Sequence, residues 1–541
     1  MFVPDFPFAY DDWLRHPAGL GHLPEHLHGT PVAVVGGGVS GIVAAYELMR
    51  LGLRPVLYEA GELGGRMRSV PFPEDPEYVA ELGAMRFPPA ATALFHYIDE
   101  LGLPTIPFPN PLAPSTPSTV VNLEGVVHRA RTLEDLPTVY QEVADAWEKT
   151  LRDQAELAAM EDAIRGRDVG WVKTIWNRLV TQFDDQSFYG FLASSSTFSS
   201  FRHREIFGQV GFGTGGWDTD FPNSILEILR VVYTQADIDH VSIVGGAQQL
   251  PLGLWRHSPP MMAHWPAGTT LESLHDGGAG PGVMRIRRSR ELITVQDSGG
   301  RIRAFPAVIF TPHVWSLLVH VDCADELLST DLWTAVERTH YMSSSKVFVL
   351  ADRPFWRDLD PRTGHEVMGM TLTDRFPRGV YLFDSGPDKP GVMCLSYTWN
   401  DDSLKFLTLD DEQRLAVLLR RLGRIYPGVD IARHVISKPI TVSWERERHF
   451  MGAFKANLPG HYRYQRRLFT QFMQDGRPAP QRGFFLCGDD VSWTAGFAEG
   501  AVTTALNAVW GVLNHLGGRT DPRNPGPGDL FHELAPVDLP L

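Results

Sequence analysis

Val32-Ala-Val-Val-Gly-Gly-Gly-Val-Ser-Gly41 is the stretch that decides the fold class of this chain. Its valines predict a buried strand, and Gly36, Gly38 and Gly41 then fit the G-x-G-x-x-G turn that leads into a helix. The first glycine permits the tight turn, the second lets the backbone approach a pyrophosphate, and the third lets the helix pack on the strand. Ser40 lies in the same turn, where helix N–H groups favour an anion. The stretch predicts a dinucleotide site.

A second predicted strand follows this helix and ends in an acid. The strand is Pro55-Val-Leu-Tyr-Glu59, and the Glu59 carboxylate is suited to accept hydrogen bonds from a ribose. A glycine triplet alone is a weak signal, whereas strand, turn, helix, strand and acid in this order form a complete unit. We therefore expect an α/β fold with a Rossmann-type nucleotide-binding domain.

Length and composition narrow the class of protein. A chain of 541 residues is too long for one core, so two interleaved or tandem domains are expected. The hydrophobic content of 43% is ordinary for a soluble globular protein, and the net charge of −15 argues against nucleic acid or an anionic membrane as partner. No apolar run is long enough to span a bilayer, and no ligand spacing matches a metal site. Three cysteines and no visible signal peptide favour the cytoplasm.

Features of the nucleotide-binding domain lie at both ends of the chain. Strand-like runs recur at residues 241–244 and 307–310, and a strand at 483–488 precedes a helix at 499–513. We therefore assign three separate segments to this domain, residues 31–95, 241–315 and 450–517.

The remaining segments have other expected roles. Residues 96–240 and 316–449 are assigned to a substrate-binding domain of mixed sheet and helices, with a helical insertion that includes an apolar stripe at 133–165. Residues 1–30 are predicted to form an arm laid over the globule. The Pro- and Gly-rich residues 518–541 are predicted to form a loose tail.

Further motifs occur along the chain: Gly64-Gly-Arg66-Met-Arg68-Ser69, Glu81-Leu-Gly-Ala-Met-Arg86-Phe-Pro88, Ser344-Ser-Lys346-Val-Phe348, Tyr397-Thr-Trp-Asn-Asp-Asp402 and the segment from Gly488 to Ala501. Through these motifs the chain resembles the flavin amine oxidase superfamily over about residues 31–515. Within it, the chain is most similar to the bacterial tryptophan and phenylalanine 2-monooxygenases and to the L-amino acid oxidases. The resemblance implies FAD, and not NAD, in a domain of discontinuous segments interleaved with the substrate domain.

Two residues are expected to carry the chemistry. Arg86 matches the arginine that binds the substrate carboxylate in this superfamily, and its planar fork suits a carboxylate in two parallel hydrogen bonds. The alternative is a structural arginine paired with Glu81 or a helix end. Lys346 matches the lysine that holds a water near the flavin N5 and influences the reaction with oxygen. Its alternative is an exposed surface lysine.

Cofactor contacts are expected from the same motifs. Arg66 and Arg68 suit phosphate or flavin contacts, while Asp489 and Glu499 have helix capping as their alternative role. The other expected contacts are Gly65, Met85 and Gly488. Where covalently flavinylated relatives carry a cysteine, residues 452–455 contain none, so the resemblance implies noncovalent FAD.

The substrate pocket is expected to be lined by aromatic residues. Trp493 and Phe497 match residues that flank the flavin face in the superfamily, and Trp444 is a further candidate, although aromatic residues are more often part of the core. Asp218 and Asp220 stand where an apolar wall would suit an indole or phenyl ring. They favour a basic substrate if they face the pocket, and carry no such meaning if they face solvent.

The resemblance implies an L-amino acid 2-monooxygenase acting on an aromatic (Trp or Phe) or basic (Arg or Lys) amino acid. FAD takes a hydride from Cα, and oxygen-dependent decarboxylation then yields an amide one carbon shorter. An L-amino acid oxidase, which releases a 2-oxo acid, ammonia and hydrogen peroxide, is the alternative. A nucleotide-binding protein without catalysis is a remote third possibility. The expected partners are an L-amino acid, molecular oxygen and a second copy of the chain in a homodimer.

Overall fold

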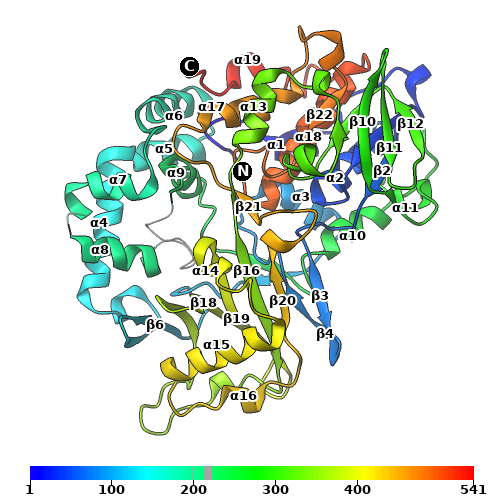
Figure 1. Ribbon diagram of the computed structural model, residues 1–541. Coiled ribbons are helices and arrows are strands. Elements are labelled where there is room, and N and C mark those ends of the chain that lie inside the picture. Colours follow the sequence, from blue (N-terminus) through cyan, green and yellow to red (C-terminus); the bar gives the residue numbers. More distant parts are fainter. Residues whose placement is uncertain (199, 212–221, 541) are drawn as a thin grey trace.

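The computed structural model describes residues 1–198, 200–211 and 222–540. Figure 1 shows three regions: a parallel sheet with its helices in the upper part, a second large sheet below it, and a lobe of helices to the left. Segments from both ends of the chain meet in the upper part, where α2 (Val39–Arg50) and α18 (Ala498–His515) lie together.

The upper sheet is parallel and has the strand order β22-β13-β1-β2-β9. Most of its strands are buried on both faces and rich in valine and phenylalanine, as is typical of a parallel sheet covered by helices on both sides. The strands come from separated segments: β1 (Pro31–Val35), β2 (Arg54–Glu59), β9 (Gly280–Pro281), β13 (Val308–Phe310) and β22 (Phe484–Leu486). This discontinuous α/β architecture confirms the expected fold class.

The carboxyl ends of three neighbouring strands lie beside the same cavity. Gly36 follows β1, Thr311 follows β13, and Gly488 comes shortly after β22, and all three residues line the same cavity. In open parallel sheets ligands bind at this edge. The sheet therefore positions the cavity described below.

The second sheet has the order β20-β16-β19-β18-β17-β6-β7 and is antiparallel except where β17 pairs with β6. Along β16, Val347 and Val349 face α15 (Asp411–Ile425), whereas Phe348 faces the opposite core. Because strand side chains alternate, Lys346 lies on the face of Phe348, away from α15. The strands are β6 (Thr119–Leu123), β7 (Val126–Ala130), β16 (Ser344–Ala351), β17 (Met370–Thr373), β18 (Gly379–Phe383), β19 (Gly391–Trp399) and β20 (Ile440–Ser443).

The helical lobe contains the stripe predicted at residues 133–165. It forms two helices instead of one, because Glu156 adopts a left-handed conformation (φ 49°) between them. The helices of the lobe are α4 (Thr138–Ala155), α5 (Leu157–Arg165), α6 (Val169–Phe183), α7 (Phe188–Ser194), α8 (Phe201–Ile206) and α9 (Ile225–Tyr233).

The remaining elements among the described residues include a smaller four-stranded sheet and three two-stranded pairs. The remaining helices are α1 (Tyr10–Arg15), α3 (Thr92–Glu100), α10 (Gln249–Arg256), α11 (Leu271–Leu274), α12 (Ser316–Val319), α13 (Thr330–Arg338), α14 (Asn400–Leu404), α16 (Ile431–His434), α17 (Tyr462–Phe469) and α19 (Phe531–Leu534). The remaining strands are β3 (Ser69–Phe72), β4 (Asp75–Glu81), β5 (Thr105–Pro107), β8 (Val241–Ile243), β10 (Val283–Ser289), β11 (Leu292–Asp297), β12 (Ile302–Phe305), β14 (Asp322–Cys323), β15 (Tyr341–Met342) and β21 (Phe454–Lys455).

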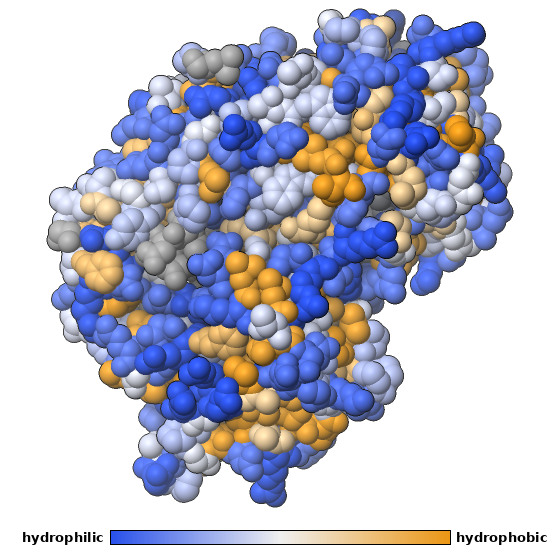
Figure 2. Space-filling model, viewed as in Figure 1, coloured by the Kyte–Doolittle hydropathy of each residue, from blue (hydrophilic) through white to orange (hydrophobic). Residues whose placement is uncertain are grey.

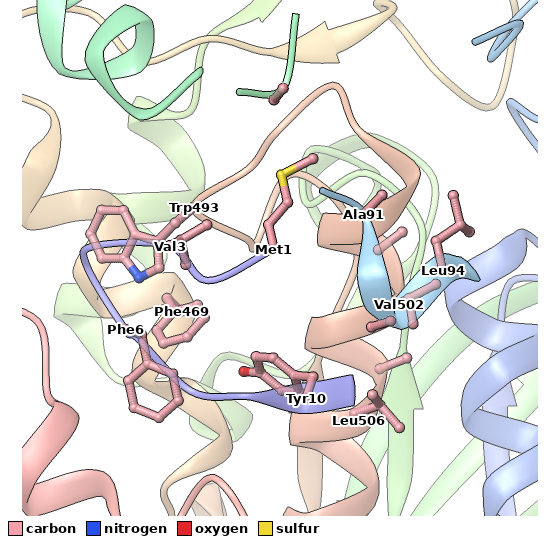
Figure 3. Packing of buried hydrophobic residues seen from close by; sticks show 14 of the residues in the cluster. Met1, Val3, Phe6, Tyr10, Ala91, Leu94, Phe469, Trp493, Val502 and Leu506 are labelled. Carbon is pink, nitrogen blue, oxygen red and sulfur yellow. The ribbon is translucent and has the colours of Figure 1, made fainter. Parts of the chain in front are cut away.

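The first residues of the chain are packed into the core. Figure 3 shows Phe6 next to the ring of Phe469, and Tyr10 next to Leu506. Phe6 is fully buried, and the Tyr10 hydroxyl donates a hydrogen bond to Asn507 on α18 (2.7 Å). The arm is thus an integral part of the core around α18.

The tail, expected to be loose, is packed as well. The Asn524 side-chain amide donates to the carbonyl oxygens of Trp13 (3.0 Å) and Gly19 (2.9 Å), which ties the tail to the arm. At Gly526 and Gly528 a Cβ atom would lie within 2.4 Å of the Trp510 ring. The glycines that suggested a loose segment are therefore needed for close approach to a tryptophan.

The face of the molecule drawn in Figure 2 is mainly polar. Figure 2 shows blue and white residues over most of this face, with orange confined to small patches. None of the helices among the described residues is both long and apolar enough to cross a membrane.

Candidate functional site

One cavity of about 670 Å³ runs from the carboxyl edge of the parallel sheet to the second sheet. Its first part is lined by the glycine-rich turn, Glu59, Arg66 and Asp489, and its second part by Lys346, Arg86 and aromatic residues. Most of the residues singled out from the sequence therefore lie on one continuous wall.

The glycine-rich turn leaves an open cradle at its centre. Gly36 has a positive φ of 99°, and a Cβ atom at Gly41 would lie 1.9 Å from the Gly36 carbonyl oxygen. Gly38, by contrast, lines the cavity, and the nearest neighbour of an added Cβ would be Gly65 Cα at 4.0 Å. The first and third glycines thus serve the chain itself, and the second leaves room for a ligand.

Two polar side chains of this region are held by the protein. Glu59 accepts hydrogen bonds from the backbone N–H groups of Gly37 (2.5 Å) and Gly61 (2.7 Å), so its carboxylate is fixed at the cavity wall. The Ser40 hydroxyl donates to the Cys487 sulfur (3.3 Å). Both residues line the cavity, and Ser40 does so from the first turn of α2.

Arg66 and Asp489 form a paired group at the middle of the cavity. Two guanidinium nitrogens of Arg66 contact the two carboxylate oxygens of Asp489, and Arg66 also donates to the Ala453 carbonyl (2.7 Å). Burial alone would raise the pKa of Asp489, but Arg66 lowers it below its usual value. Burial and Asp489 raise the pKa of the neighbouring Asp490 to about 6, and Asp490 accepts a hydrogen bond from Tyr341 (2.5 Å). This network fixes the loop after β22.

His313 is a cavity residue that the sequence did not suggest. Its Nδ1 contacts the Phe450 carbonyl, so this nitrogen carries the proton, and burial followed by Arg66 lowers the His313 pKa to about 3. The buried Nε2 is then an acceptor, and it has no partner among the described residues. A neutral acceptor on this wall fits a ligand that carries hydroxyl groups.

Arg68 differs from the expectation. It is not part of the cavity wall: it forms an ion pair with Glu447 (2.7 Å) and stacks on the rings of Trp444 (4.9 Å) and Phe450 (5.6 Å). Glu447 is 379 positions away in the sequence, which is why the motif alone did not indicate this pairing. Arg68 packs on Trp444, which lines the cavity, but is not itself on the wall.

Lys346 lies buried on β16, with only 2% of its surface exposed. Its ammonium donates to the carbonyl oxygens of Glu81 (3.1 Å) and Gly83 (2.6 Å) and lies 4.7 Å from the centre of the Tyr397 ring. Burial lowers the pKa of Lys346 to about 8 and raises that of the nearby Glu81 to about 7. The reading of Lys346 as an exposed lysine is excluded.

Arg86 lies on the same wall and is near enough to lower the pKa of Lys346. Its guanidinium donates to the Tyr381 hydroxyl (3.2 Å) and stacks against the rings of Phe108 (5.5 Å) and Tyr381 (5.8 Å). Glu81, its suggested structural partner, instead accepts from Ser69 and the Ala247 N–H. The guanidinium is planar by itself, and the aromatic neighbours restrict its orientation, which suits recognition of a carboxylate.

Aromatic residues line the cavity around Arg86 and Lys346. Trp444, Trp493 and Phe497 are all on the wall, and Trp493 is packed on Tyr462 and Phe469 at its other side. The Trp444 indole N–H donates to the Leu82 carbonyl (3.0 Å), so this ring is held in place. Tyr397 and Trp399 also line the wall, although the sequence analysis used them only as part of a family motif.

The remaining expected contacts divide into two groups. Gly65, Met85 and Gly488 line the cavity, and Glu499 lines it as well. The Glu499 carboxylate, however, accepts from the N–H groups at the start of α3 and contacts the Met1 amino group, so it is satisfied within the protein. Asp218 and Asp220 lie outside the described residues.

No group of histidine, cysteine and acidic residues that could hold a metal ion occurs in the part of the chain that the structure describes. The cradle at Gly38, the pair of Arg66 and Asp489 and the acceptor Nε2 of His313, unpaired among the described residues, together fit a bound dinucleotide. The adjoining arginine, lysine and aromatic residues fit a small organic anion beside it.

Comparison with known proteins agrees with this arrangement. The family of flavin-containing amine oxidoreductases matches residues 39–513. The chain is 33% identical to a tryptophan 2-monooxygenase of Pseudomonas savastanoi, with 96% of each chain covered, and 32% identical to that of Pantoea agglomerans pv. gypsophilae (95% and 94%). It is 25% identical to an L-amino-acid oxidase of Siganus canaliculatus (91% and 86%).

Solved structures share the fold. A putrescine oxidase double mutant superposes with a TM-score of 0.65 at 19% identity, covering 90% of this chain and 99% of the other. Cyclohexylamine oxidase from Brevibacterium oxydans gives 0.63 at 16% identity, with coverage of 90% and 99%. The family match over most of the chain, together with this fold, shows that the protein belongs to the flavin-containing amine oxidoreductases and is a flavin enzyme acting on amines or amino acids.

Proposed function

We propose that this enzyme is an FAD-dependent L-amino acid 2-monooxygenase. The observation that carries the proposal is the meeting of Arg86 and Lys346 on one aromatic wall, next to a cradle suited to a dinucleotide. The similarity to tryptophan 2-monooxygenases over nearly the full length supports it.

The residues have distinct roles in this proposal. Arg86 binds the substrate carboxylate and so orients the Cα–H bond, since misplacement by about 1 Å costs on the order of a hundredfold in rate. Bound FAD would supply the acceptor for the hydride that leaves Cα. Lys346 supplies a positive charge in a water-poor place, where electrostatic stabilisation is strongest.

Overall, an amino acid and oxygen give the amide, carbon dioxide and water. This outcome requires that the imino acid meets peroxide before it leaves the site. The burial of Lys346 (2% exposed) and Trp399 (7% exposed) favours retention. Release of the imino acid would instead give oxidase chemistry, which the similarity to an L-amino-acid oxidase keeps as the alternative.

An aromatic amino acid is the substrate that the wall favours. Tyr397, Trp399 and Phe454 line the cavity and contact one another in series, and the Tyr397 ring lies 4.7 Å from the Lys346 ammonium. Aromatic side chains gain from offset and edge-to-face contacts. A basic substrate remains the alternative. It would require that Asp218 and Asp220 face the pocket.

Anaerobic titration with single L-amino acids tests the proposal. Bleaching of the flavin absorbance by one side-chain class identifies the substrate, and admission of air then allows the product to be analysed. An amide supports the monooxygenase, and a 2-oxo acid with ammonia supports the oxidase. A yellow protein that no L-amino acid bleaches contradicts both.

We further propose that FAD is bound noncovalently. All three cysteines lie within the described residues, and none of them lines the cavity. Acid precipitation of the protein is expected to release the whole flavin into the supernatant, identified as FAD by chromatography. Yellow colour retained in the pellet would contradict the proposal.

The cradle gives a prediction for Gly38→Ala. The added methyl group has free space within the protein but occupies the place proposed for the pyrophosphate. We expect a folded protein whose dissociation constant for FAD is raised about tenfold or more, as for overpacking that costs 1–3 kcal/mol. Titration of the apoprotein with FAD measures this. Gly41→Ala is the contrasting variant, because its methyl group would collide with the Gly36 carbonyl and disturb folding itself.

A further inference from the structure

One face of α9 forms part of the cavity wall. Glu227, Val231 and Thr234 are spaced at i, i+4 and i+7, which places them on one side of the helix, and all three line the cavity. The same wall carries Arg86 and Lys346. α9 therefore presents one carboxylate, one aliphatic side chain and one hydroxyl to the cavity, and Arg230 of the same helix lines it as well.

The Glu227 carboxylate is only half satisfied by the protein. Its Oε1 accepts from Arg230 Nη1 (2.5 Å) and from the Asn457 side-chain amide (2.9 Å). Its Oε2 receives no hydrogen bond from the described residues, although the side chain is only 11% exposed. One oxygen is thus anchored, and the other remains an acceptor in a shielded place.

The N-terminal arm sets the position of this carboxylate. Asp5, fully buried, accepts from Arg230 Nε (2.6 Å) and Nη2 (3.1 Å) and from the Trp176 indole N–H (2.8 Å). The Arg230 guanidinium lies near the rings of Trp176 (5.3 Å) and Trp493 (5.0 Å), which restrict its plane. Asp5 therefore orients Arg230, and Arg230 orients Glu227.

The charges of Asp5, Arg230 and Glu227 favour a ligand that donates a hydrogen bond to Glu227. Arg230 lies between the carboxylates of Asp5 and Glu227. Asp5 therefore reduces the electrostatic effect of the positive charge of Arg230 on Glu227. Lys455 is the other cation that acts on Glu227, but its ammonium donates to Gln465 and to the Ser492 carbonyl (3.2 Å). A shielded acceptor of this kind pairs best with an N–H group, above all a cationic one.

We propose that Glu227 accepts a hydrogen bond from an N–H group of the bound amino acid, and that Asp5 is a positioning residue that acts on Glu227 through Arg230. The N–H group is either the α-amino group or a nitrogen in the side chain. This inference rests on the proposed function, because it takes the Arg86 end of the cavity as the substrate site.

Anaerobic titrations of the FAD-loaded protein with L-tryptophan, L-phenylalanine and L-lysine test it. Glu227→Gln is expected to raise the Kd about ten- to hundredfold, because a hydrogen bond to a charged group is lost. If the α-amino group is the donor, the Kd rises equally for all amino acids that bind. If a side-chain nitrogen is the donor, the Kd rises for tryptophan or lysine and stays unchanged for phenylalanine. Unchanged Kd values for every amino acid that bleaches the wild-type flavin overturn the proposal.

Asp5→Asn tests the positioning role, with Asp12→Asn as the matched control. Asp12 belongs to the same arm, but its exposed carboxylate pairs with Arg167 at the surface. We expect Asp5→Asn to lower the affinity for the same amino acids as Glu227→Gln while the Kd for FAD is kept. Its melting temperature should fall, because the buried ion pair with Arg230 is weakened, and Asp12→Asn should change none of these. In the Glu227→Gln background, Asp5→Asn should add little. Additive effects, or loss of FAD with unchanged amino-acid binding, overturn the role of Asp5.

The outcomes also separate this inference from the proposed function. If no amino acid bleaches the wild-type flavin, the proposed function fails. If amino acids bleach it and Glu227→Gln binds them as well as the wild type does, only the present inference fails.

Discussion

Arg86→Ala is expected to raise the dissociation constant for L-amino acids by about two to three orders of magnitude while flavin remains bound. Removal of one partner of a shielded, hydrogen-bonded charge pair costs roughly 2–5 kcal/mol. Arg86 is held by the Tyr381 hydroxyl and by two aromatic rings, so its guanidinium is already oriented before the substrate arrives. Anaerobic titration of the flavin absorbance measures the change.

The control for this prediction is a ligand without the carboxylate. The amine that corresponds to the best amino acid, such as tryptamine for tryptophan, should bind wild type and Arg86→Ala with similar affinity. Arg86→Lys should recover only part of the binding, because a lysine does not offer two parallel hydrogen bonds. Equal losses for the amine and the amino acid would remove Arg86 from the carboxylate site.

Lys346→Met is expected to slow reoxidation of the reduced enzyme by oxygen about 10²- to 10³-fold. This is the range for loss of one preorganised electrostatic contact in a water-poor site. Lys346 is such a contact, because it is buried and held by two backbone carbonyls. Stopped-flow mixing of photoreduced enzyme with oxygenated buffer measures the rate, and anaerobic reduction by the amino acid should change less.

The pH dependence of the same step follows from the Lys346 pKa of about 8. A lysine is charged below its pKa, so the positive charge is present at pH 7 and is lost as the pH rises through about 8. The groups that act on it are Cys394, Glu81 and Arg86, of which Glu81 has a pKa raised to about 7 by burial. The reoxidation rate of the wild type should therefore fall above about pH 8. A Lys346→Met variant with the same fall would assign the titration to another group.

Much of the nucleotide-binding region could be predicted from the sequence, because its determinants are local. The turn at Gly36–Gly41, the strands at its borders and the acid at Glu59 lie close together in the chain, and each has a stereochemical reason for its residue type. The position of Lys346 came from a motif, and its apolar neighbours on β16 were consistent with burial.

Residues whose environment depends on distant segments could not be assigned in this way. Arg68 lies two positions from Arg66, yet it pairs with Glu447 outside the cavity. His313 and Glu227 carry no motif, and only the packing of β13, α9 and β21 places them on the wall. The composition of the tail suggested a loose segment because its contact with Trp510 is invisible in the sequence. The homodimer and the cytoplasmic location stay predictions.

The buried arm has a consequence for the order in which the protein matures. Tyr10 and its hydrogen-bond partner Asn507 are 497 positions apart, so the arm can dock only after almost the whole polypeptide has been synthesised. Until then, the apolar side chains of its first residues are exposed to solvent or to other proteins. Contacts between such distant segments slow folding and prolong the time during which aggregation competes. Burial of the arm against α18 thus has to wait until this C-terminal helix has been made.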